Sequence, residues 1–249
     1  MYILLPPSET KTRPEHGAPF TLEALSHPEL TGARETALRA AQRTASGPDA
    51  AGKLRIPASR PELVERMQDL SREPAAAART VYSGVLYDAL GEASPTPDRE
   101  VFITSALFGL VSAADPIPAY RVSAGSTLSR LGTAGSWWRS RLAVVGHRIG
   151  ESGRVVIDCR SGAYRTMMPV PGAHLVVPLR EAADGTRSVV SHDAKRYRGL
   201  LTAALLQAPR VAHDRDEVIE LARAAFGTGL VVEAGDRGEI VIVERETLA

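Results

Sequence analysis

The sequence predicts an α+β fold, a mixed sheet with helices around it. Helix-like and strand-like segments follow one another without the strict strand–helix–strand alternation of a doubly wound protein. The 249 residues are 44% hydrophobic, which is enough to bury a sizeable core. Neither an internal repeat nor a clear linker between domains stands out, so we expect residues 1–249 to form a single compact domain.

The first half of the chain begins with a short buried strand, Tyr2–Leu5, which a Pro-Pro pair ends. The polar residues 10–19 predict a loop, and the Gly-, Pro- and Ala-rich residues 46–61 predict a linker or exposed loop. The spacing of apolar residues predicts helices over residues 33–45, 62–71 and 75–90. Gly91 follows the third of these helices, where a glycine is expected to end it.

The second half mixes short strands with longer helices. The expected strands are residues 100–105, 120–123, 154–159, 174–179, 188–191, 230–234 and 240–243. The expected helices are residues 134–145, 194–207 and 216–226. The last two strands are predicted to form a hairpin around the turn Asp236-Arg237-Gly238.

The charge balance argues against a dedicated nucleic-acid binder. The 30 Lys and Arg residues nearly match the 29 Asp and Glu residues, for a formal net charge of +1. Aromatic residues make up only 5% of the chain, which leaves little material for stacking on bases. A basic stripe is therefore the only nucleic-acid footprint that we expect this composition to allow.

The single cysteine and the hydropathy profile indicate the compartment. Cys159 lies in an apolar strand, which predicts a buried, inert thiol rather than a redox centre, and suits a reducing cytoplasm. No segment approaches the roughly 18 apolar residues of a membrane span. We therefore expect a cytoplasmic protein without a membrane partner.

The segment Pro7-Ser8-Glu9-Thr10-Lys11-Thr12 directly follows the first strand. Loops at strand ends often carry functional groups, because a rigid element positions them. Lys11 would hold an anion there, or act as a base if it were desolvated. The glycines of a phosphate-binding P-loop are absent. A polar surface loop is the alternative.

Gly84 lies inside the predicted helix 75–90, between Tyr82 and Tyr87. A helical glycine costs about 1 kcal/mol relative to alanine. Gly84 therefore indicates either close packing or a surface that faces a ligand. A core helix with tyrosines at its rim is the interpretation that the spacing favours.

Residues 105–110, followed by Asp115 and Arg121, read as a strand, a Gly-interrupted segment and a Pro-rich turn. A hairpin here would present backbone amides to a DNA phosphate, although the second glycine that such hairpins use is missing. The alternative is a structural connection in which Asp115 acts as a cap and Arg121 forms an ion pair.

Asp158 and Arg160 lie two positions apart at a predicted strand end, so their side chains point to the same side. They are expected either to pair with each other or to flank a ligand.

Residues 191–199 form the start of a predicted helix, with Ser191 or Asp193 as its N-cap. Lys195 and Arg198 are three positions apart and hence adjacent on the helix surface. Cations near a helix N-terminus oppose the helix dipole, so their presence indicates a positive anion-binding pocket. Solvated surface charge is the alternative.

Metal and dinucleotide signatures are absent. The six histidines show no metal-ligand spacing, and one cysteine cannot build a zinc site. No G-x-S-x-G or G-x-G-x-x-G motif occurs. We therefore expect no metal and no cofactor.

Taken in order, these segments resemble the YaaA family (DUF328/UPF0246), whose members are described as peroxide stress proteins. The first strand and its Pro-Ser-Glu-x-Lys-Thr loop are similar to the actinobacterial branch of the family. Further family motifs are matched by residues 82–87, by Ser105, Leu107, Gly109, Asp115, Tyr120, Arg121 and Gly125, by Asp158, Ser161 and Tyr164, and by Lys195, Arg198 and Gly199. Each motif alone is weak, but five in order are specific.

The resemblance implies a compact α+β fold with a positively charged cleft. It also implies a role in peroxide-stress defence that limits iron-driven damage, and DNA binding through a helix-hairpin-helix-like element. It settles no reaction. This sequence departs from the family block at Ala106 and Phe108, and has Val111-Ser112-Ala113 where the family has Leu-Arg-Pro. The lost arginine would remove a phosphate contact.

Two hypotheses of function follow. In the first, a YaaA-like stress protein binds DNA or another phosphate-bearing ligand through Ser8, Arg121, Ser161, Lys195 and Arg198. In the second, the protein is an enzyme on a nucleotide, nucleobase or other small anion, with proton transfer by Lys11, Asp158 or Tyr164. A small-ligand binding protein without turnover is a third alternative.

The shape of the surface separates these hypotheses. An uninterrupted basic stripe around Ser112 would favour DNA. An enclosed pocket that joins Lys11, Asp158 and Lys195 would favour an enzyme.

Overall fold

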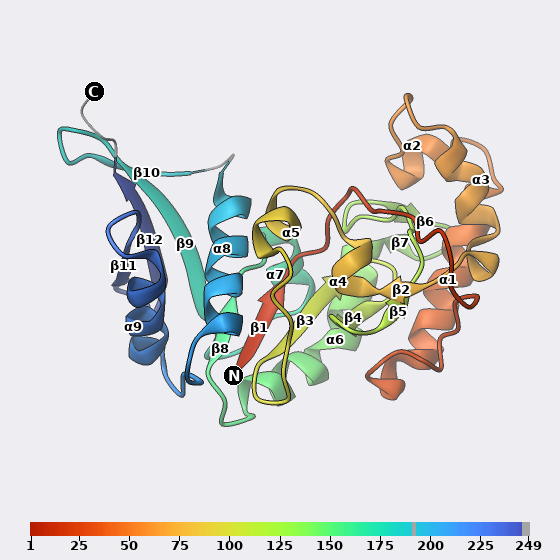
Figure 1. Cartoon of the computed structure of the whole chain (residues 1–249). Coiled ribbons are helices and arrows are strands. Elements are labelled where there is room, and N and C mark those ends of the chain that lie inside the picture. The colour runs from red at the N-terminus through yellow and green to blue at the C-terminus, as the bar shows by residue number, and fades with distance from the viewer. Residues whose placement is uncertain (191–192, 246–249) are drawn as a thin grey trace.

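The structure is a computed structural model that describes residues 1–190 and 193–245. Its centre is a mixed sheet with strand order β11-β12-β9-β8-β1-β3-β4, in which β10 pairs with β9. These strands are β1 (Tyr2–Leu5), β3 (Glu100–Ser105), β4 (Gly109–Ser112), β8 (Val156–Asp158), β9 (His174–Glu181), β10 (Arg187–Val189), β11 (Val231–Ala234) and β12 (Ile240–Arg245). The predicted α+β fold is confirmed (Figure 1).

The first strand lies in the middle of the sheet. β1 pairs in parallel with β3 on one side and with β8 on the other, and Ile3, Leu4 and Leu5 are fully buried. Because these three strands are parallel, their carboxyl ends open on one edge of the sheet. In open sheets, such an edge, at a strand whose two neighbours come from different crossovers, is where ligands bind.

Helices cover this sheet and extend it into a second lobe. The helices are α1 (Thr31–Ala45), α2 (Ala50–Leu54), α3 (Glu62–Gln68), α4 (Ala78–Val81), α5 (Val85–Leu90), α6 (Ala134–Gly150), α7 (Gly162–Met167), α8 (Ala194–Gln207) and α9 (Arg215–Phe226). In Figure 1, α5 and α8 lie side by side in front of the sheet, and α1, α2 and α3 form the lobe at the opposite end from β11. Every helix in the described ranges is too short or too polar to cross a membrane.

Two ribbons of two-residue strands complete the fold. β2 (Ala76–Ala77) pairs with β5 (Pro116–Ile117), and β6 (Thr127–Leu128) pairs with β7 (Gly132–Thr133). Two 3₁₀ turns, Pro28–Leu30 and Leu70–Arg72, flank the helices of the lobe.

Two predicted elements are wrong. The helix expected over residues 75–90 is the short strand β2 followed by α4 and α5, because Gly84 takes φ 94°, which an α-helix does not accommodate. The strand expected over residues 120–123 is an irregular segment in which the Arg121 amide points at the Met67 sulfur, 3.1 Å away. In both segments the backbone lacks the regular hydrogen bonds of the predicted helix or strand.

Other predictions hold with shifted ends. The first strand, residues 100–105 and residues 194–207 are confirmed at their predicted bounds, and the closing hairpin of β11 and β12 is antiparallel as expected. The predicted loop 46–61 contains the short helix α2. Asp193 occupies the N-cap position of α8, whereas the alternative cap Ser191 lies outside the described residues.

Candidate anion-binding site

A pocket of about 420 Å³ opens at the carboxyl edge of the sheet. Four segments line it: the loop after β1, the break before α5, the start of α7 and the first turns of α8. Its lining residues are Pro6, Pro7, Ser8, Glu9, Thr10, Ser83, Gly84, Val85, Leu86, Tyr87, Ser161, Tyr164, Lys195 and Arg198. The fold thus brings together the predicted site residues Ser8, Ser161, Tyr164, Lys195 and Arg198.

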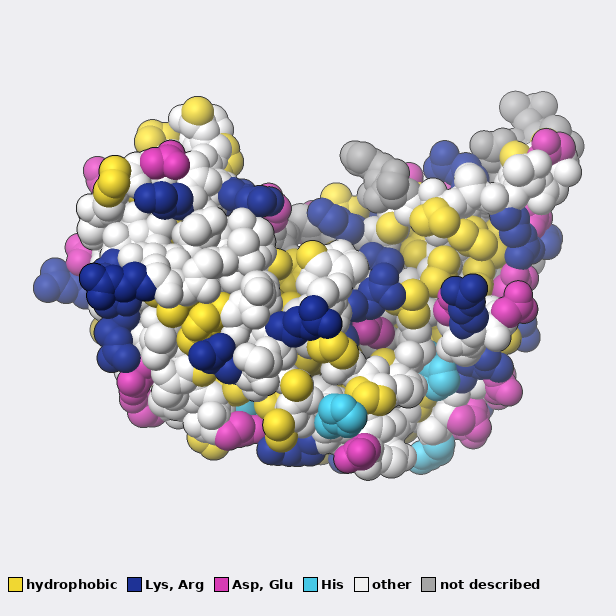
Figure 2. Space-filling view, turned by 180° about the vertical axis from the view of Figure 1, so that it is seen from behind, with side chains coloured by type: hydrophobic (Ala, Val, Ile, Leu, Met, Phe, Trp, Pro, Cys, Tyr) yellow, Lys and Arg dark blue, Asp and Glu magenta, His cyan; other side chains and the backbone are white. Residues whose placement is uncertain are grey.

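Seen from behind, the molecule is hollowed along its upper edge. Figure 2 shows this hollow between the raised end that carries α2 and α3 and the raised end formed by β9 and β10. Lys and Arg side chains lie on both sides of the hollow.

The loop after β1 is held by an antiparallel bridge between Lys11 and Tyr82. The Thr12 amide donates to the Val81 carbonyl at 2.8 Å, and the Ser83 amide donates to the Thr10 carbonyl at 3.3 Å. The loop is therefore fixed against the segment between α4 and α5. Sequence alone indicated a loop here but not the partner that orders it.

Gly84 lines the pocket at the break between α4 and α5. Its φ of 94° strains any residue with a Cβ, and a Cβ placed here would lie 3.7 Å from the Ser8 hydroxyl oxygen. The sequence left open whether Gly84 allows close packing or faces a ligand. Its position in the lining of the pocket agrees with the second interpretation.

The start of α8 also lines the pocket, and Gly199 allows this helix to pack close to α5. A Cβ on Gly199 would lie 2.2 Å from the Leu86 carbonyl oxygen, so only glycine permits this approach. Lys195 and Arg198 consequently reach the pocket, with Lys195 exposed and Arg198 half-buried.

The Arg198 side chain has hydrogen-bond donors that are not used within the described residues. Its Nη2 donates to the Val176 carbonyl at 3.3 Å, and its Nε is buried without a hydrogen-bond partner among the described residues. Burial lowers the pKa of this guanidinium. A guanidinium offers five N–H donors, so the remaining ones can bind an oxyanion in bidentate fashion.

Ser161 and Tyr164 contribute hydroxyl groups from the turn after β8. Ser161 lies at the N-cap position of α7, and Tyr164 is on the first turn of that helix. Burial raises the pKa of Tyr164 to about 12, so its phenol is protonated at neutral pH and can donate a hydrogen bond.

Lys11 and Arg121 lie in a smaller recess that shares Glu9 and Thr10 with the pocket. Lys11 Nζ donates to the Ser8 carbonyl at 2.7 Å and lies 4.2 Å from the centre of the Tyr120 ring. Burial, and next the charge of Arg121, lower the pKa of Lys11 to about 7. Lys11 is thus poised near neutrality, as a base or nucleophile requires.

Arg121 forms the ion pair that one interpretation of the sequence predicted. Its Nη1 donates to the Glu9 carbonyl at 2.8 Å, its Nη2 donates to the Arg55 carbonyl at 2.9 Å, and the same Nη2 lies 3.1 Å from Glu9 Oε2. Arg121 therefore lines the recess rather than the larger pocket.

Asp158 does not line the pocket. Arg160 donates to both of its carboxylate oxygens, through Nε at 2.9 Å and Nη2 at 2.7 Å, in a buried environment. Of the two roles that the sequence left open, the internal ion pair is the observed one. The carboxylate is thus committed to a structural contact.

Comparison with known proteins identifies the family. Residues 1–224 match the family described as "Peroxide stress protein YaaA". The chain is 41% identical over 240 residues to a UPF0246 protein of Corynebacterium efficiens, covering 95% of this chain and 96% of that protein. It is also 34% identical over 248 residues to a UPF0246 protein of Streptomyces coelicolor, covering 96% and 95%.

The chain belongs to the YaaA family. The resemblance that the sequence motifs predicted is confirmed. The hairpin of β11 and β12 follows the matched residues 1–224, yet β12 pairs with β9 inside the main sheet.

The block that we expected to depart from the family pattern contains an interior hairpin of β3 and β4. Ala106, Leu107 and Phe108 are fully buried between β3 and β4. The amides of Leu107 and Phe108 point at the Ser105 hydroxyl oxygen, at 3.3 and 3.0 Å. These amides are therefore turned inward and are not presented to a phosphate.

Side chains from neighbouring segments donate hydrogen bonds to the backbone carbonyls of that hairpin. Arg34 donates to the Phe108 and Leu110 carbonyls at 3.0 and 2.7 Å, and Trp138 Nε1 donates to the Ala106 carbonyl at 2.9 Å. Asp115 accepts from the Ser112 amide at 3.0 Å, as the capping interpretation predicted. The segment is a structural connection.

Cys159 is fully buried, as the sequence predicted. Burial raises the pKa of its thiol to about 12, so the reactive thiolate is scarce at neutral pH.

Several lining residues carry no signal in the sequence. Val85 and Leu86 form an apolar wall of the pocket, and Arg60 and Arg66 line the smaller recess. Nothing in the spacing around α3 distinguishes Arg60 and Arg66 from solvated charges. The Arg60 side chain is 53% exposed and pairs with Glu62, whereas that of Arg66 is 16% exposed.

Proposed function

We propose that this YaaA-family protein binds a small molecule that joins an anionic group to an apolar or aromatic body, and that it does so in a response to peroxide stress. The observation that carries this proposal is a single pocket in which two adjacent cations of α8, Lys195 and Arg198, share a cavity with the hydroxyl groups of Ser8, Ser161 and Tyr164. Charge-assisted hydrogen bonds of this kind are the strong ones in anion recognition.

The rest of the pocket suits the uncharged part of such a ligand. A volume of about 420 Å³ lies within the usual range of small-molecule sites, roughly 300–1,000 Å³. The apolar wall is formed by Pro6, Pro7, Val85, Leu86 and Tyr87. A nucleotide combines a phosphate with a flat, weakly polar base, which matches the two halves of the pocket.

DNA is the second candidate ligand, supported by the Lys and Arg side chains on both sides of the hollow in Figure 2. The inward-facing hairpin of β3 and β4 weighs against it, since that segment corresponds to the element implied in DNA contact. The proposal therefore favours a small ligand, in a single-domain cytoplasmic protein.

An enzymatic role is the alternative that Lys11 supports. Its pKa is about 7. Among the described lysines that line the pocket or the recess, it is therefore the one best suited to exchange a proton at neutral pH. Tyr164 would act only as a donor, since its pKa is about 12, and Asp158 is paired with Arg160. Lys11 is thus the base that we would assign if turnover is found.

A role in peroxide stress would not run through a thiol. The chain has one cysteine, and its buried thiol has a raised pKa. Peroxide attacks thiolates, so we propose that ligand binding rather than cysteine oxidation links the protein to stress.

The test compares small ligands with DNA on matched variants. Calorimetric titration with nucleoside monophosphates and diphosphates is run on the wild type, Lys195→Ala and Arg196→Ala. Arg196 is an exposed cation on the same helix that does not line the pocket. We expect Lys195→Ala to weaken binding about tenfold, as the loss of one charged hydrogen bond does, and Arg196→Ala to leave it unchanged.

Fluorescence anisotropy with labelled duplex DNA completes the test. Phosphate contacts make log affinity fall with log salt, by about 0.9 units of slope per contact. A steep slope that flattens in Lys195→Ala would assign the site to DNA. Absence of binding to every nucleotide and to DNA at low salt would reject the proposal.

A further inference from the structure

The recess beside the pocket contains a lysine whose surroundings differ from those of the other lysines. Lys11, Lys53 and Lys195 are the only lysines among the 30 Lys and Arg residues of the chain. Lys53 and Lys195 are exposed, whereas Lys11 is partly buried and lines the recess. An arginine stays protonated in a protein, but a desolvated lysine can become a neutral amine. In a chain that otherwise uses arginine, this partly buried cation is thus of the type that can lose its proton.

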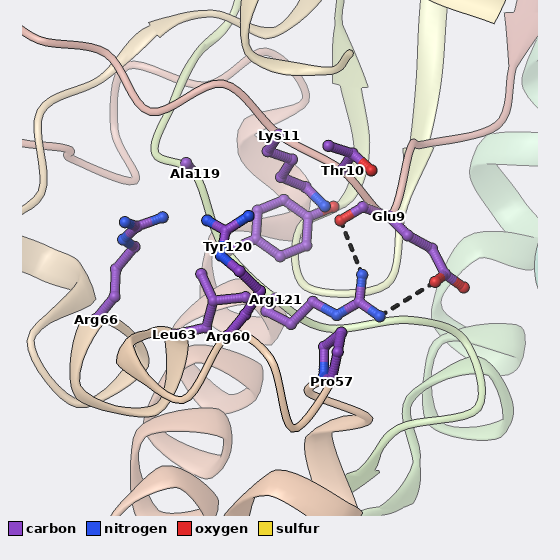
Figure 3. A pocket seen from close by; sticks show the side chains of 10 residues that line it. All are labelled: Glu9, Thr10, Lys11, Pro57, Arg60, Leu63, Arg66, Ala119, Tyr120 and Arg121. Carbon is purple, nitrogen blue, oxygen red and sulfur yellow. Dashed lines mark hydrogen bonds and ion pairs between the residues drawn. The ribbon is translucent and has the colours of Figure 1, made fainter. Parts of the chain in front are cut away.

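The Lys11 amine is held by one hydrogen bond and two aromatic rings. Its Nζ donates to the Ser8 carbonyl at 2.7 Å, and lies 4.2 Å from the centre of the Tyr120 ring and 5.3 Å from that of the Tyr82 ring. Figure 3 shows Lys11 beside the Tyr120 ring. The antiparallel bridge to Tyr82 fixes the backbone of Lys11. The amine is therefore already positioned before a ligand enters, and its neutral form keeps a lone pair for another atom.

Within residues 1–190 and 193–245, no carboxylate forms an ion pair with Lys11. Glu9 is the acidic residue that lines the recess, and its carboxylate contacts Arg121 Nη2 at 3.1 Å instead. An ion pair would hold the amine in its protonated form, whereas burial, and next the charge of Arg121, lower the pKa of Lys11 to about 7. About half of the Lys11 side chains are therefore neutral amines at pH 7.

The recess has room for a small and partly apolar molecule. Its volume is about 90 Å³, which corresponds to about three water molecules at roughly 30 Å³ each. Pro57, Leu63, Ala119 and Tyr120 contribute apolar surface to its lining. A compound of a few heavy atoms with an electrophilic carbon fits this space, and a whole nucleotide does not.

The Tyr120 hydroxyl is not free to take part in proton transfer. It lies 2.7 Å from the Ser105 hydroxyl and 2.8 Å from that of Tyr82. Burial raises the pKa of Tyr120 far above its ordinary value. The phenol is thus a fixed part of the wall, and Lys11 is the group beside it that can react.

We propose that Lys11 is a nucleophilic amine, which forms an imine with a small aldehyde that enters the recess. The nitrogen lone pair attacks the carbonyl carbon, and the carbonyl oxygen then leaves as water together with the two amine protons. The step needs neither an oxidant nor a reductant, and water reverses it. When the imine nitrogen takes up a proton from solvent, the Tyr120 ring stabilises its positive charge. Lys11 does not line the larger pocket, so the proposal does not depend on the ligand proposed there.

The probe is propionaldehyde, with sodium cyanoborohydride to reduce an imine to a stable secondary amine. The full-length wild type, Lys11→Arg and Lys53→Arg are labelled at pH 7.5, and peptide mass spectrometry locates the modified residues and separates Lys11 from the Met1 amine. Lys11→Arg keeps the charge and removes the nucleophile, and Lys53→Arg does the same for an exposed lysine. We expect Lys11 to be labelled at least about tenfold faster than Lys53 and Lys195, because an ordinary lysine with a pKa of about 10.4 is almost entirely protonated.

The pH profile separates a lowered pKa from simple access to the reagent. Labelling of Lys11 should level off above about pH 8, whereas labelling of Lys53 should keep rising about tenfold per pH unit to about pH 10. Unfolding in urea should abolish the difference, since it returns Lys11 to solvent. Both measurements use the wild type, so they hold even if Lys11→Arg fails to fold.

Loss of the rapidly labelled site in Lys11→Arg, but not in Lys53→Arg, would support the proposal. Labelling of Lys11 at the rate of Lys53, or a Lys11 rate that rises to pH 10 in step with that of Lys53, would overturn it. Selective labelling that persists in urea would also overturn it, since the neighbouring sequence rather than the folded recess would then be the cause.

Discussion

Asp158 and Arg160, at the end of β8, form a closed ion pair, whereas Lys195 and Arg198, on α8, line an open pocket. The first two side chains are 7% and 1% exposed, and Arg160 also donates to the Met168 carbonyl at 2.8 Å. Within residues 1–190 and 193–245, by contrast, the Arg198 side chain makes one long hydrogen bond of 3.3 Å, and Lys195 is exposed. Both sets lie near the same edge of the sheet.

The difference teaches how charge is divided between stability and binding. A buried pair must satisfy itself, because an uncompensated charge in the interior is very costly. At the pocket, the exposed Lys195 stays hydrated, and the half-buried Arg198 has donors left for a ligand. Removing a charge from the first set should therefore cost stability, and removing one from the second should cost binding.

The largest effect is expected for Asp158→Ala. Arg160 would be left buried without its counter-ion, so the free energy of unfolding should fall by about 3–5 kcal/mol. Urea unfolding followed by circular dichroism measures this loss. Glu100→Gln is the matched control: it breaks the Arg154–Glu100 pair, whose side chains are 38% and 40% exposed, and should cost less than about 1 kcal/mol. Equal losses in the two variants would remove the distinction between closed and open pairs.

Lys11 should make stability depend on pH. Its pKa is about 7 in the folded protein and 10.5 ordinarily, so between these values the unfolded chain holds a proton that the folded chain lacks. The free energy of unfolding of the wild type should then rise with pH, relative to Lys11→Met, by at most about 1.4 kcal/mol per pH unit. Below pH 7 this gain is absent.

Urea titrations of both proteins between pH 6 and 10 supply the measurement for Lys11. A difference between the two proteins that stays flat with pH would show that Lys11 is a solvated cation. It would then belong with Lys195 rather than with the buried charges.

Gly199→Ala tests the wall that presents Lys195 and Arg198. The added methyl group would meet the Leu86 carbonyl oxygen at 2.2 Å, so α8 must move away from α5. We expect a loss of roughly 1–3 kcal/mol, as overpacking produces. Gly32→Ala in α1, where no atom lies within 4 Å of the new Cβ, should be neutral or stabilising. A thermal melt of both variants gives the comparison, and a tolerated Gly199→Ala would show that the wall is not tightly packed.

The smallest effect on stability is expected for Lys195→Ala. An exposed lysine on a helix contributes within about 0.5 kcal/mol, so the unfolding curve should match that of the wild type. A substantial loss of stability would mean that Lys195 is part of the framework and would erase the contrast with Asp158.

Elements with strong local patterns were predictable. Residues 194–207 and 100–105 have the predicted bounds because continuous apolar spacing and flanking turn residues mark both ends. The helix expected over residues 75–90 failed, since apolar spacing continues across Gly84 although the backbone does not. The strand expected over residues 120–123 is not formed: the Arg121 amide points at the Met67 sulfur, and the Arg121 side chain donates to the Arg55 carbonyl.

The candidate site was predictable in part. Ser8, Ser161, Tyr164, Lys195 and Arg198 share one pocket, as the anion-site hypothesis required. Lys11 and Arg121 line the adjoining recess, and Asp158 forms an ion pair with Arg160. The functional groups of each motif could be read from the sequence. The distances between motifs could not, because they depend on the order of the strands in the sheet.

The sequence by itself determined the family, the α+β class, the buried cysteine and the residue types available for anion binding, because these follow from local pattern and composition. Tertiary structure alone decided which charged side chains are buried in an internal ion pair and which line a pocket. Placing β1 between β3 and β8 brings the loop after β1 to the end of β8, and the contact at Gly199 brings α8 to α5. Burial then separates a structural ion pair from a binding site, since the cost of charge depends on its surroundings.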